Sequence, residues 1–292
     1  MKLCLGTVQF GMDYGIQGGR KPSKKDVFEI LDYAADHGIT TLDTACGYGD
    51  AESIVGEYNQ CTSFQFDIIS KLSKDIFLNL PSSDYIDTAE RTLEMSLLKL
   101  MSPKLKGLLF HNPAYLYDEN AVKALMYLKH AGFTEGIGVS VYEPVDAEYA
   151  LQLGMDIIQL PANLFDRRFD HFLEKVGAVS KVYTRSIYLQ GMLLMEIEEI
   201  SKKLPAAVEY VTKFDELCRS FHYSRREVAM SYMKNKHGVN SILFGVDNLL
   251  QLKENIAAYE QKVPDEIIDE ISRNFVNINE DIVSPLKWKK LQ

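Results

Sequence analysis

Short apolar runs alternate along the chain with segments in which apolar residues recur every three or four positions. Eight runs are rich in β-branched and aromatic residues and predict strands, at residues 4–10, 40–45, 66–72, 106–111, 136–141, 155–163, 181–189 and 241–246. Between the first two runs, apolar residues at positions 27, 30, 31 and 34 follow helical spacing. Ser23 and Asp26 form a capping box ahead of them, and Gly38 ends the predicted helix.

Helical spacing recurs over residues 86–100, before the fourth predicted strand, and over 249–259, after the eighth. Strands that alternate with helices favour parallel pairing, because a parallel connection needs a crossover segment. Eight such units predict a (β/α)8 TIM barrel, an α/β fold, as one domain spanning residues 1–292. A doubly wound sheet is the alternative.

Composition narrows the possible partners. The chain has 292 residues, of which 46% are hydrophobic and 25% charged, which is typical of a soluble globular protein. The formal net charge is −9 and no basic face is evident, so nucleic acid is not an expected partner. The N-terminal apolar run breaks at Gly6, too early for a signal peptide or a membrane span. Four cysteines without CxxC spacing fit a reducing compartment, so we expect a cytoplasmic protein.

Several common functional motifs are absent from the sequence. The nearest match to a GxGxxG fingerprint, "GIGVS" at residues 136–140, lacks the third glycine and lies within a predicted strand. No HExxH, GxSxG or P-loop motif occurs, and no metal site is expected. Metalloprotease, hydrolase and kinase chemistry therefore have no support.

Polar residues gather where the predicted strands end. In a barrel these carboxyl ends meet on one rim, where active sites lie. The residues in question, in chain order, are Asp43, Lys71, His111, Ser140, Gln159, Asn163, Arg185, Ser186 and Asp247, with Tyr48 on the loop after the second strand. Taken singly, Asp43 and Lys71 could form a structural ion pair and Tyr48 could simply pack. Together they place a carboxylate, an ammonium, an imidazole and a phenol on neighbouring strand ends.

The stretches "LDTACGYGDAESIVGEY", "SKL" and "LLFHNP" resemble the aldo-keto reductase superfamily. The resemblance covers most of the chain. It implies a (β/α)8 barrel that transfers hydride reversibly between a nicotinamide and a carbonyl or alcohol. It also implies that Asp43, Tyr48, Lys71 and His111 form the catalytic tetrad. Tyr48 would donate the proton, and the Lys71 cation would lower its pKa, because a nearby positive charge favours the phenolate.

The resemblance extends to the cofactor, NADP(H) or NAD(H). Ser140 and Gln159 resemble residues that hold the nicotinamide carboxamide, and Arg185 and Ser186 lie in the segment that covers the cofactor. At the adenosine end, Gly245 and Asn255 match the family, whereas Val246, Asp247 and Gln251 fall where members often carry Ser, Lys or Arg for the 2′-phosphate. Because a carboxylate repels that phosphate, we expect NADH to bind at least as well as NADPH, unless Arg185 or Lys253 reaches the phosphate.

The only indication of the substrate in the sequence is a group of positive charges. Arg167, Arg168 and Arg185 could form a cationic patch that binds an anionic carbonyl or sugar substrate, such as a phosphorylated or nucleotide-linked sugar. Alternatively, Arg167 and Arg168 pair with Asp166 and Asp170. Two other functions remain compatible with the sequence: a redox-neutral sugar isomerase or epimerase that retains its nicotinamide, and a nucleotide-binding sensor with little turnover. The pattern gives no oligomeric state.

Overall fold

Eight parallel strands close into a barrel in chain order, with β1 hydrogen-bonded to both β2 and β8. The structure is a computed structural model and describes residues 1–16 and 18–288. The strands are β1 (Lys2–Gly6), β2 (Thr41–Asp43), β3 (Asp67–Leu72), β4 (Gly107–Phe110), β5 (Ile137–Ser140), β6 (Ile157–Pro161), β7 (Lys181–Arg185) and β8 (Ser241–Gly245). The predicted (β/α)8 barrel is confirmed.

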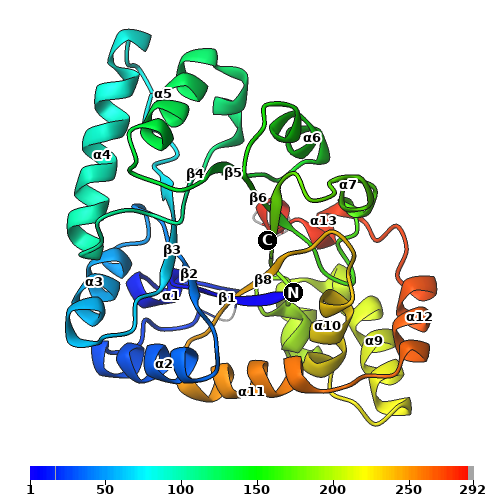
Figure 1. Cartoon of the computed structure of the whole chain (residues 1–292). Coiled ribbons are helices and arrows are strands. Elements are labelled where there is room, and N and C mark those ends of the chain that lie inside the picture. The colour runs from blue at the N-terminus through cyan, green and yellow to red at the C-terminus, as the bar shows by residue number, and fades with distance from the viewer. Residues whose placement is uncertain (17, 289–292) are drawn as a thin grey trace.

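Helices surround the barrel, and they alternate with the strands along the chain (Figure 1). The α-helices are α1 (Val8–Gly11), α2 (Lys24–Asp36), α3 (Ala51–Cys61), α4 (Tyr85–Leu100), α5 (Glu119–His130), α6 (Pro144–Gln152), α7 (Asp170–Lys175), α8 (Ile197–Lys203), α9 (Val208–Ser220), α10 (Arg225–Lys234), α11 (Leu249–Glu260), α12 (Asp265–Asn274), α13 (Glu280–Val283) and α14 (Pro285–Trp288). Short 3-10 helices lie at η1 (Ser82–Asp84), η2 (Pro113–Tyr117), η3 (Met192–Leu194) and η4 (Pro205–Ala207). Among the described residues, no helix is both long and apolar enough to span a membrane.

Helix α2 shows how local sequence sets an element. The Ser23 side chain accepts a hydrogen bond from the Asp26 amide, and the Asp26 carboxylate accepts one from the Ser23 amide, as the capping box predicts. Such a cap contributes about 1 kcal/mol. The four apolar residues at helical spacing, Val27 to Ala34, are all fully buried, and each larger one contributes roughly 1.5–3 kcal/mol. Gly38 follows with a φ of +75°, which suits a residue without a Cβ.

Two strands end earlier than the sequence predicts. The first run was expected to stay extended to residue 10, but β1 ends at Gly6 and Val8–Gly11 form α1. The change occurs at Thr7, whose amide and hydroxyl both donate to the Asp43 carbonyl oxygen and whose own carbonyl oxygen accepts from the Phe10 amide in the first helical turn. Similarly, β7 ends at Arg185 and the chain then turns through positive φ at Ser186. Both segments are apolar because side chains such as Phe10 and Leu189 are buried, and an apolar run alone does not distinguish a buried helix or turn from a strand.

Candidate active site

A buried ion pair joins the ends of two strands. Lys71 of β3 donates to Asp43 of β2 over 2.7 Å and to the Thr44 carbonyl oxygen over 2.8 Å. The side chains of Lys71 and Asp43 are 1% and 5% exposed. Gln159 of β6 donates its amide to the second carboxylate oxygen of Asp43, also over 2.7 Å. Three strands therefore hold one carboxylate fixed, with a hydrogen bond to each of its oxygens.

Tyr48 lies beside this pair, on the turn that follows β2. The Lys71 ammonium is 5.1 Å from the centroid of the Tyr48 ring, and the His111 ring meets it edge-on with centroids 5.9 Å apart. The backbone around Tyr48 is tightly packed: a Cβ added to Gly11 would lie 1.7 Å from the Tyr48 carbonyl oxygen. Gly49, with a φ of +58°, turns the chain against Gly11. Only glycine fits either position, so close backbone contact with α1 fixes the main chain at Tyr48.

The pKa of Tyr48 differs from the sequence-based expectation. Burial raises the pKa, the Lys71 cation lowers it, and the Asp43 carboxylate raises it again, so that it lies above its ordinary value. The expected effect of Lys71 is present, but burial outweighs it. A phenol in this environment keeps its proton throughout the physiological range, which suits a proton donor.

Lys71 and His111 respond to the same surroundings in opposite ways. Burial alone would lower the pKa of Lys71, but Asp43 and Tyr48 outweigh it, so the pKa lies above its usual range and the residue stays cationic. Burial lowers the pKa of His111 to about 3, together with the positive charges of Lys71, Lys74 and Arg185. His111 is therefore neutral at physiological pH.

A cavity of about 310 Å³ opens beside Tyr48 and extends towards α11. Most of the residues predicted from sequence to bind cofactor line it, namely Gln159, Arg185, Ser186, Gly245, Asp247, Gln251 and Asn255, and Asp43 and Tyr48 line it as well. Ser140 and Val246 do not line it, and neither do Lys71 and His111, so the cofactor contacts expected of Ser140 and Val246 stay predictions. Ser140 is 2% exposed and Val246 is fully buried, because their side chains are packed within the protein.

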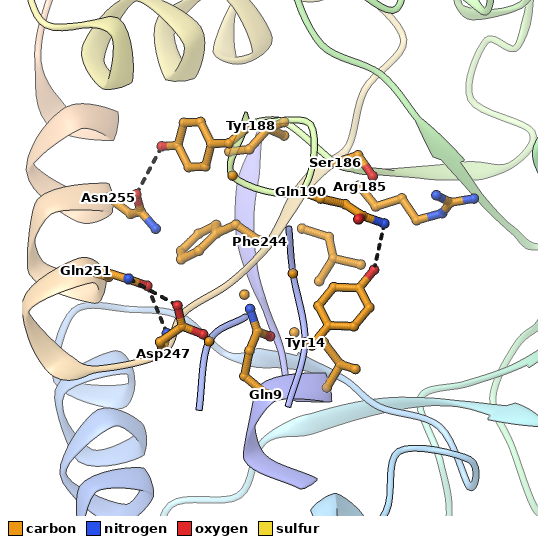
Figure 2. A pocket seen from close by; sticks show the side chains of 18 of the residues that line it. Gln9, Tyr14, Arg185, Ser186, Tyr188, Gln190, Phe244, Asp247, Gln251 and Asn255 are labelled. Atoms are coloured by element: carbon orange, nitrogen blue, oxygen red, sulfur yellow. Dashed lines mark hydrogen bonds between the residues drawn. The ribbon is translucent and has the colours of Figure 1, made fainter. Parts of the chain in front are cut away.

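One end of the cavity carries a carboxylate with a free oxygen. Gln251 donates to Asp247 Oδ2 over 3.2 Å and accepts from the Asp247 amide over 2.8 Å. Asp247 Oδ1 is buried and has no hydrogen-bond partner among the described residues. The backbone of Gly19 closes on this carboxylate, since a Cβ there would lie 2.6 Å from Oδ1. Figure 2 shows Asp247 and Gln251 on the same side of the cavity as Asn255.

Asn255 belongs to a network that the sequence did not reveal. Its side-chain oxygen accepts from the Tyr188 hydroxyl over 3.0 Å and from the Arg226 guanidinium over 2.6 Å. Arg226 also pairs with Glu254 at 2.8 Å. Arg226 and Tyr188 line the cavity, as do Tyr14 and Gln190. Arg226 lies on α10 and reaches the site only because α10 packs against α11, a contact that no local pattern signals.

Arg167 and Arg168 do not line the cavity, which corrects the expectation that they face it. Arg167 pairs with Asp170 at 3.0 Å and donates to the Ser272 carbonyl oxygen over 2.9 Å. Arg168 binds the buried Asp166 and also approaches Glu143 and Glu280. The paired alternative therefore holds for both arginines, and these contacts join the loop after β6 to the C-terminal segment. Of the three arginines expected at the pocket, Arg185 alone lines the cavity.

The cavity has groups that suit a nicotinamide dinucleotide. Besides Asp247 Oδ1, the buried side-chain oxygen of Gln9 has no partner among the described residues and lies on the cavity wall. Gly245 lies directly beside it, since a Cβ there would be 2.2 Å from the end of the Gln9 side chain. Unsatisfied buried acceptors cost stability unless a ligand supplies donors, as ribose hydroxyls and a carboxamide can.

Comparisons with known proteins agree with this assignment. The Aldo/keto reductase family profile matches residues 2–274. The uncharacterized oxidoreductase YqkF of Bacillus subtilis is 26% identical over 256 residues, covering 80% of this chain and 82% of that protein.

Two solved structures share the fold. The aldo-keto reductase AKR11C1 from Bacillus halodurans, in its holo form, superposes with a TM-score of 0.76 at 19% identity, covering 97% of this chain and 95% of the other. The glycerol dehydrogenase AKR11B4 from Gluconobacter oxydans gives 0.72 at 19% identity, covering 95% and 93%. The chain therefore belongs to the aldo/keto reductase family of nicotinamide-dependent oxidoreductases.

Proposed function

We propose that this enzyme reduces the carbonyl group of a small sugar or nucleotide-linked sugar, with Tyr48 as proton donor and NADH as the favoured cofactor. The observation that carries the proposal is the position of Tyr48 on the cavity wall, beside the buried Lys71–Asp43 pair. The four free cysteines are consistent with a reducing compartment, and we assign the reaction to the cytoplasm.

Cofactor binding is assigned to six residues of the cavity wall, namely Gln159, Ser186, Gly245, Asp247, Gln251 and Asn255, and Arg185 lies beside them. When bound, the nicotinamide supplies or accepts a hydride. Hydride arrival at a carbonyl carbon leaves negative charge on the oxygen, which needs a proton within hydrogen-bond reach. Tyr48 donates that proton through its hydroxyl and is left as a phenolate.

Lys71 stabilises the phenolate that this donation creates, because its buried ammonium lies 5.1 Å from the Tyr48 ring. Asp43 keeps Lys71 charged and fixed in position, and Gln159 fixes Asp43 in turn. The neutral His111 donates a hydrogen bond to the carbonyl oxygen and thereby orients it toward Tyr48. Water then returns a proton to Tyr48. Read in reverse, the same steps oxidise an alcohol.

The preference for NADH rests on Asp247. Its free Oδ1 can accept a hydrogen bond from a ribose hydroxyl, whereas a 2′-phosphate would meet a like charge. The two residues that could have reversed this preference are placed elsewhere. Lys253 lies over the Tyr33 ring with its ammonium 5.1 Å from the centroid, and Arg185 lies on the opposite side of the cavity from Asp247 (Figure 2). Arg226, near the same end, is paired with Glu254.

Replacement of Tyr48 by Phe tests the proposal. The change removes one hydroxyl and keeps the ring, so cofactor binding should stay nearly unchanged in a fluorescence titration. The single-turnover rate of carbonyl reduction should fall about 10²- to 10⁴-fold, the usual range for loss of a general acid.

Tyr117→Phe is a matched control, because Tyr117 is 55% exposed and donates to Asp146, outside the cavity. This variant should keep the wild-type rate. A Tyr48→Phe variant that kept at least half of the wild-type single-turnover rate would show that Tyr48 is not the proton donor. A protein that bound the nucleotide without turnover would instead fit a sensor.

A further inference from the structure

Arg185 differs from the other arginine on the cavity wall. Arg226 is neutralised by Glu254, but no described carboxylate lies within 4.0 Å of the Arg185 guanidinium. The side chain is nevertheless held in place. One terminal nitrogen donates to the Val141 carbonyl oxygen over 2.9 Å, and the guanidinium lies 4.4 Å from the centroid of the Tyr142 ring. Its other donors have no partner among the described residues.

The position of Arg185 separates it from the adenosine end of the cavity. In Figure 2 it lies beyond Gln190 and Tyr14, on the opposite side from Asp247 and Asn255. Its charge also acts on Tyr48 and His111. Burial has the largest effect on the pKa of each, and nearby cations, Arg185 among them, lower both pKa values. The guanidinium therefore belongs to the end of the cavity where the carbonyl reacts.

The reacting end of the cavity has an excess of positive charge. Asp43 is neutralised by Lys71, and His111 is uncharged. Arg185 and the exposed Lys74, whose charge also reaches His111, have no carboxylate partner among the described residues. A fixed, half-buried cation without a counter-ion favours binding of an anion, because desolvation of the guanidinium is then offset by charge-assisted hydrogen bonds.

We propose that Arg185 binds an oxyanion, a carboxylate or a phosphate, carried by the carbonyl substrate. This inference rests on the proposed function and narrows its substrate class. The unused donors of the planar guanidinium match two oxygens of such a group, and stacking on Tyr142 fixes the plane in advance. Substrates with the anion should be turned over more efficiently than neutral ones of similar shape.

Two matched substrate pairs test this with NADH as cofactor. Phenylglyoxylate against its methyl ester reports on a carboxylate, and D-glyceraldehyde 3-phosphate against D-glyceraldehyde reports on a phosphate. We expect kcat/KM to be at least tenfold higher for the charged member of one pair, and that pair identifies the anion. Arg185→Gln should reduce this charged-to-neutral ratio at least tenfold, and Arg185→Lys should restore part of it.

Arg167→Gln is the control, since Arg167 lies near the same rim but is bound by Asp170. Its charged-to-neutral ratio should equal that of the wild type. A wild-type ratio near one for both pairs, or a ratio that Arg185→Gln leaves unchanged, overturns the inference while turnover of the neutral aldehyde still supports the proposed function.

If the wild type turns over none of the four compounds, calorimetry on the NADH-saturated protein decides the question. Benzoate should then bind at least tenfold more tightly than benzamide, and Arg185→Gln should abolish the difference. Equal binding of the two compounds overturns the inference.

Discussion

Cofactor choice can be tested by removing the charge of Asp247. The carboxylate is held by Gln251, and its free Oδ1 is buried at the cavity wall. A phosphate carries a charge of about −1.5 to −2 near neutral pH. Two unit charges about 4 Å apart repel by about 1 kcal/mol in water and by about 4 kcal/mol near a protein surface. Even the lower figure gives about 1.5–2 kcal/mol against NADPH, or roughly a tenfold to thirtyfold preference for NADH.

Asp247→Asn keeps the shape of the side chain and removes this repulsion. The ratio of the NADPH and NADH dissociation constants should therefore fall about tenfold, and Asp247→Arg should move the preference further toward NADPH. Both constants are measured for each variant by fluorescence titration at one ionic strength, because salt screens the interaction. Glu260→Gln is the matched control: it removes one negative charge from the exposed end of α11 and should leave the ratio unchanged.

Two results would contradict this role of Asp247. Wild-type protein that binds NADPH tenfold more tightly than NADH, a difference of about 1.4 kcal/mol, would mean that Asp247 does not face the 2′ position. The same conclusion would follow if the ratio of the NADPH and NADH dissociation constants were equal in Asp247→Asn and in the wild type.

Two further predictions concern the groups around Tyr48. In Lys71→Met the pH at which carbonyl reduction falls off should rise, because the cation that lowers the pKa of Tyr48 is gone. The double variant Asp43→Asn/Lys71→Met leaves no unpaired buried charge and therefore controls for misfolding. An unchanged pH profile would refute the role of Lys71. For His111 the folded pKa of about 3 lies below the unfolded value of about 6.5, so its contribution to stability is present above pH 6.5 and is lost as the pH falls toward 3. Wild-type protein should lose about 2 kcal/mol of unfolding free energy through this residue between pH 7 and pH 5, and His111→Gln should not; equal losses in urea titrations of the two proteins would contradict this.

Much of the fold and part of the candidate site follow from local sequence. Strands and helices differ in the period of their apolar positions, and parallel strands end on the same rim. The proximity of Asp43 and Lys71 could therefore be predicted, and they form an ion pair of 2.7 Å. The capping box at Ser23 was visible for the same reason, since both partners lie within four residues.

Other features depend on packing between segments distant in sequence. Burial determines the direction of the Tyr48 pKa, and burial is set by the barrel as a whole. Arg168 is held partly by Glu280, which lies more than a hundred residues away. Val246 follows β8 directly, but its side chain is packed in the core, and sequence does not show which way a residue after a strand points. Arg226 reaches Asn255 only through the contact between two helices.

Closure of the barrel also affects how the chain folds during its synthesis. β1 pairs with β8 over five residues, from Lys2 opposite Ser241 to Gly6 opposite Gly245. During synthesis one edge of β1 has no partner in its own chain until β8 has left the ribosome. An unpaired strand edge is a template for pairing with other chains, and contacts between distant segments form slowly. The nascent protein is therefore most exposed to aggregation just before its last strand appears, and any fragment that stops before Ser241 leaves the barrel open.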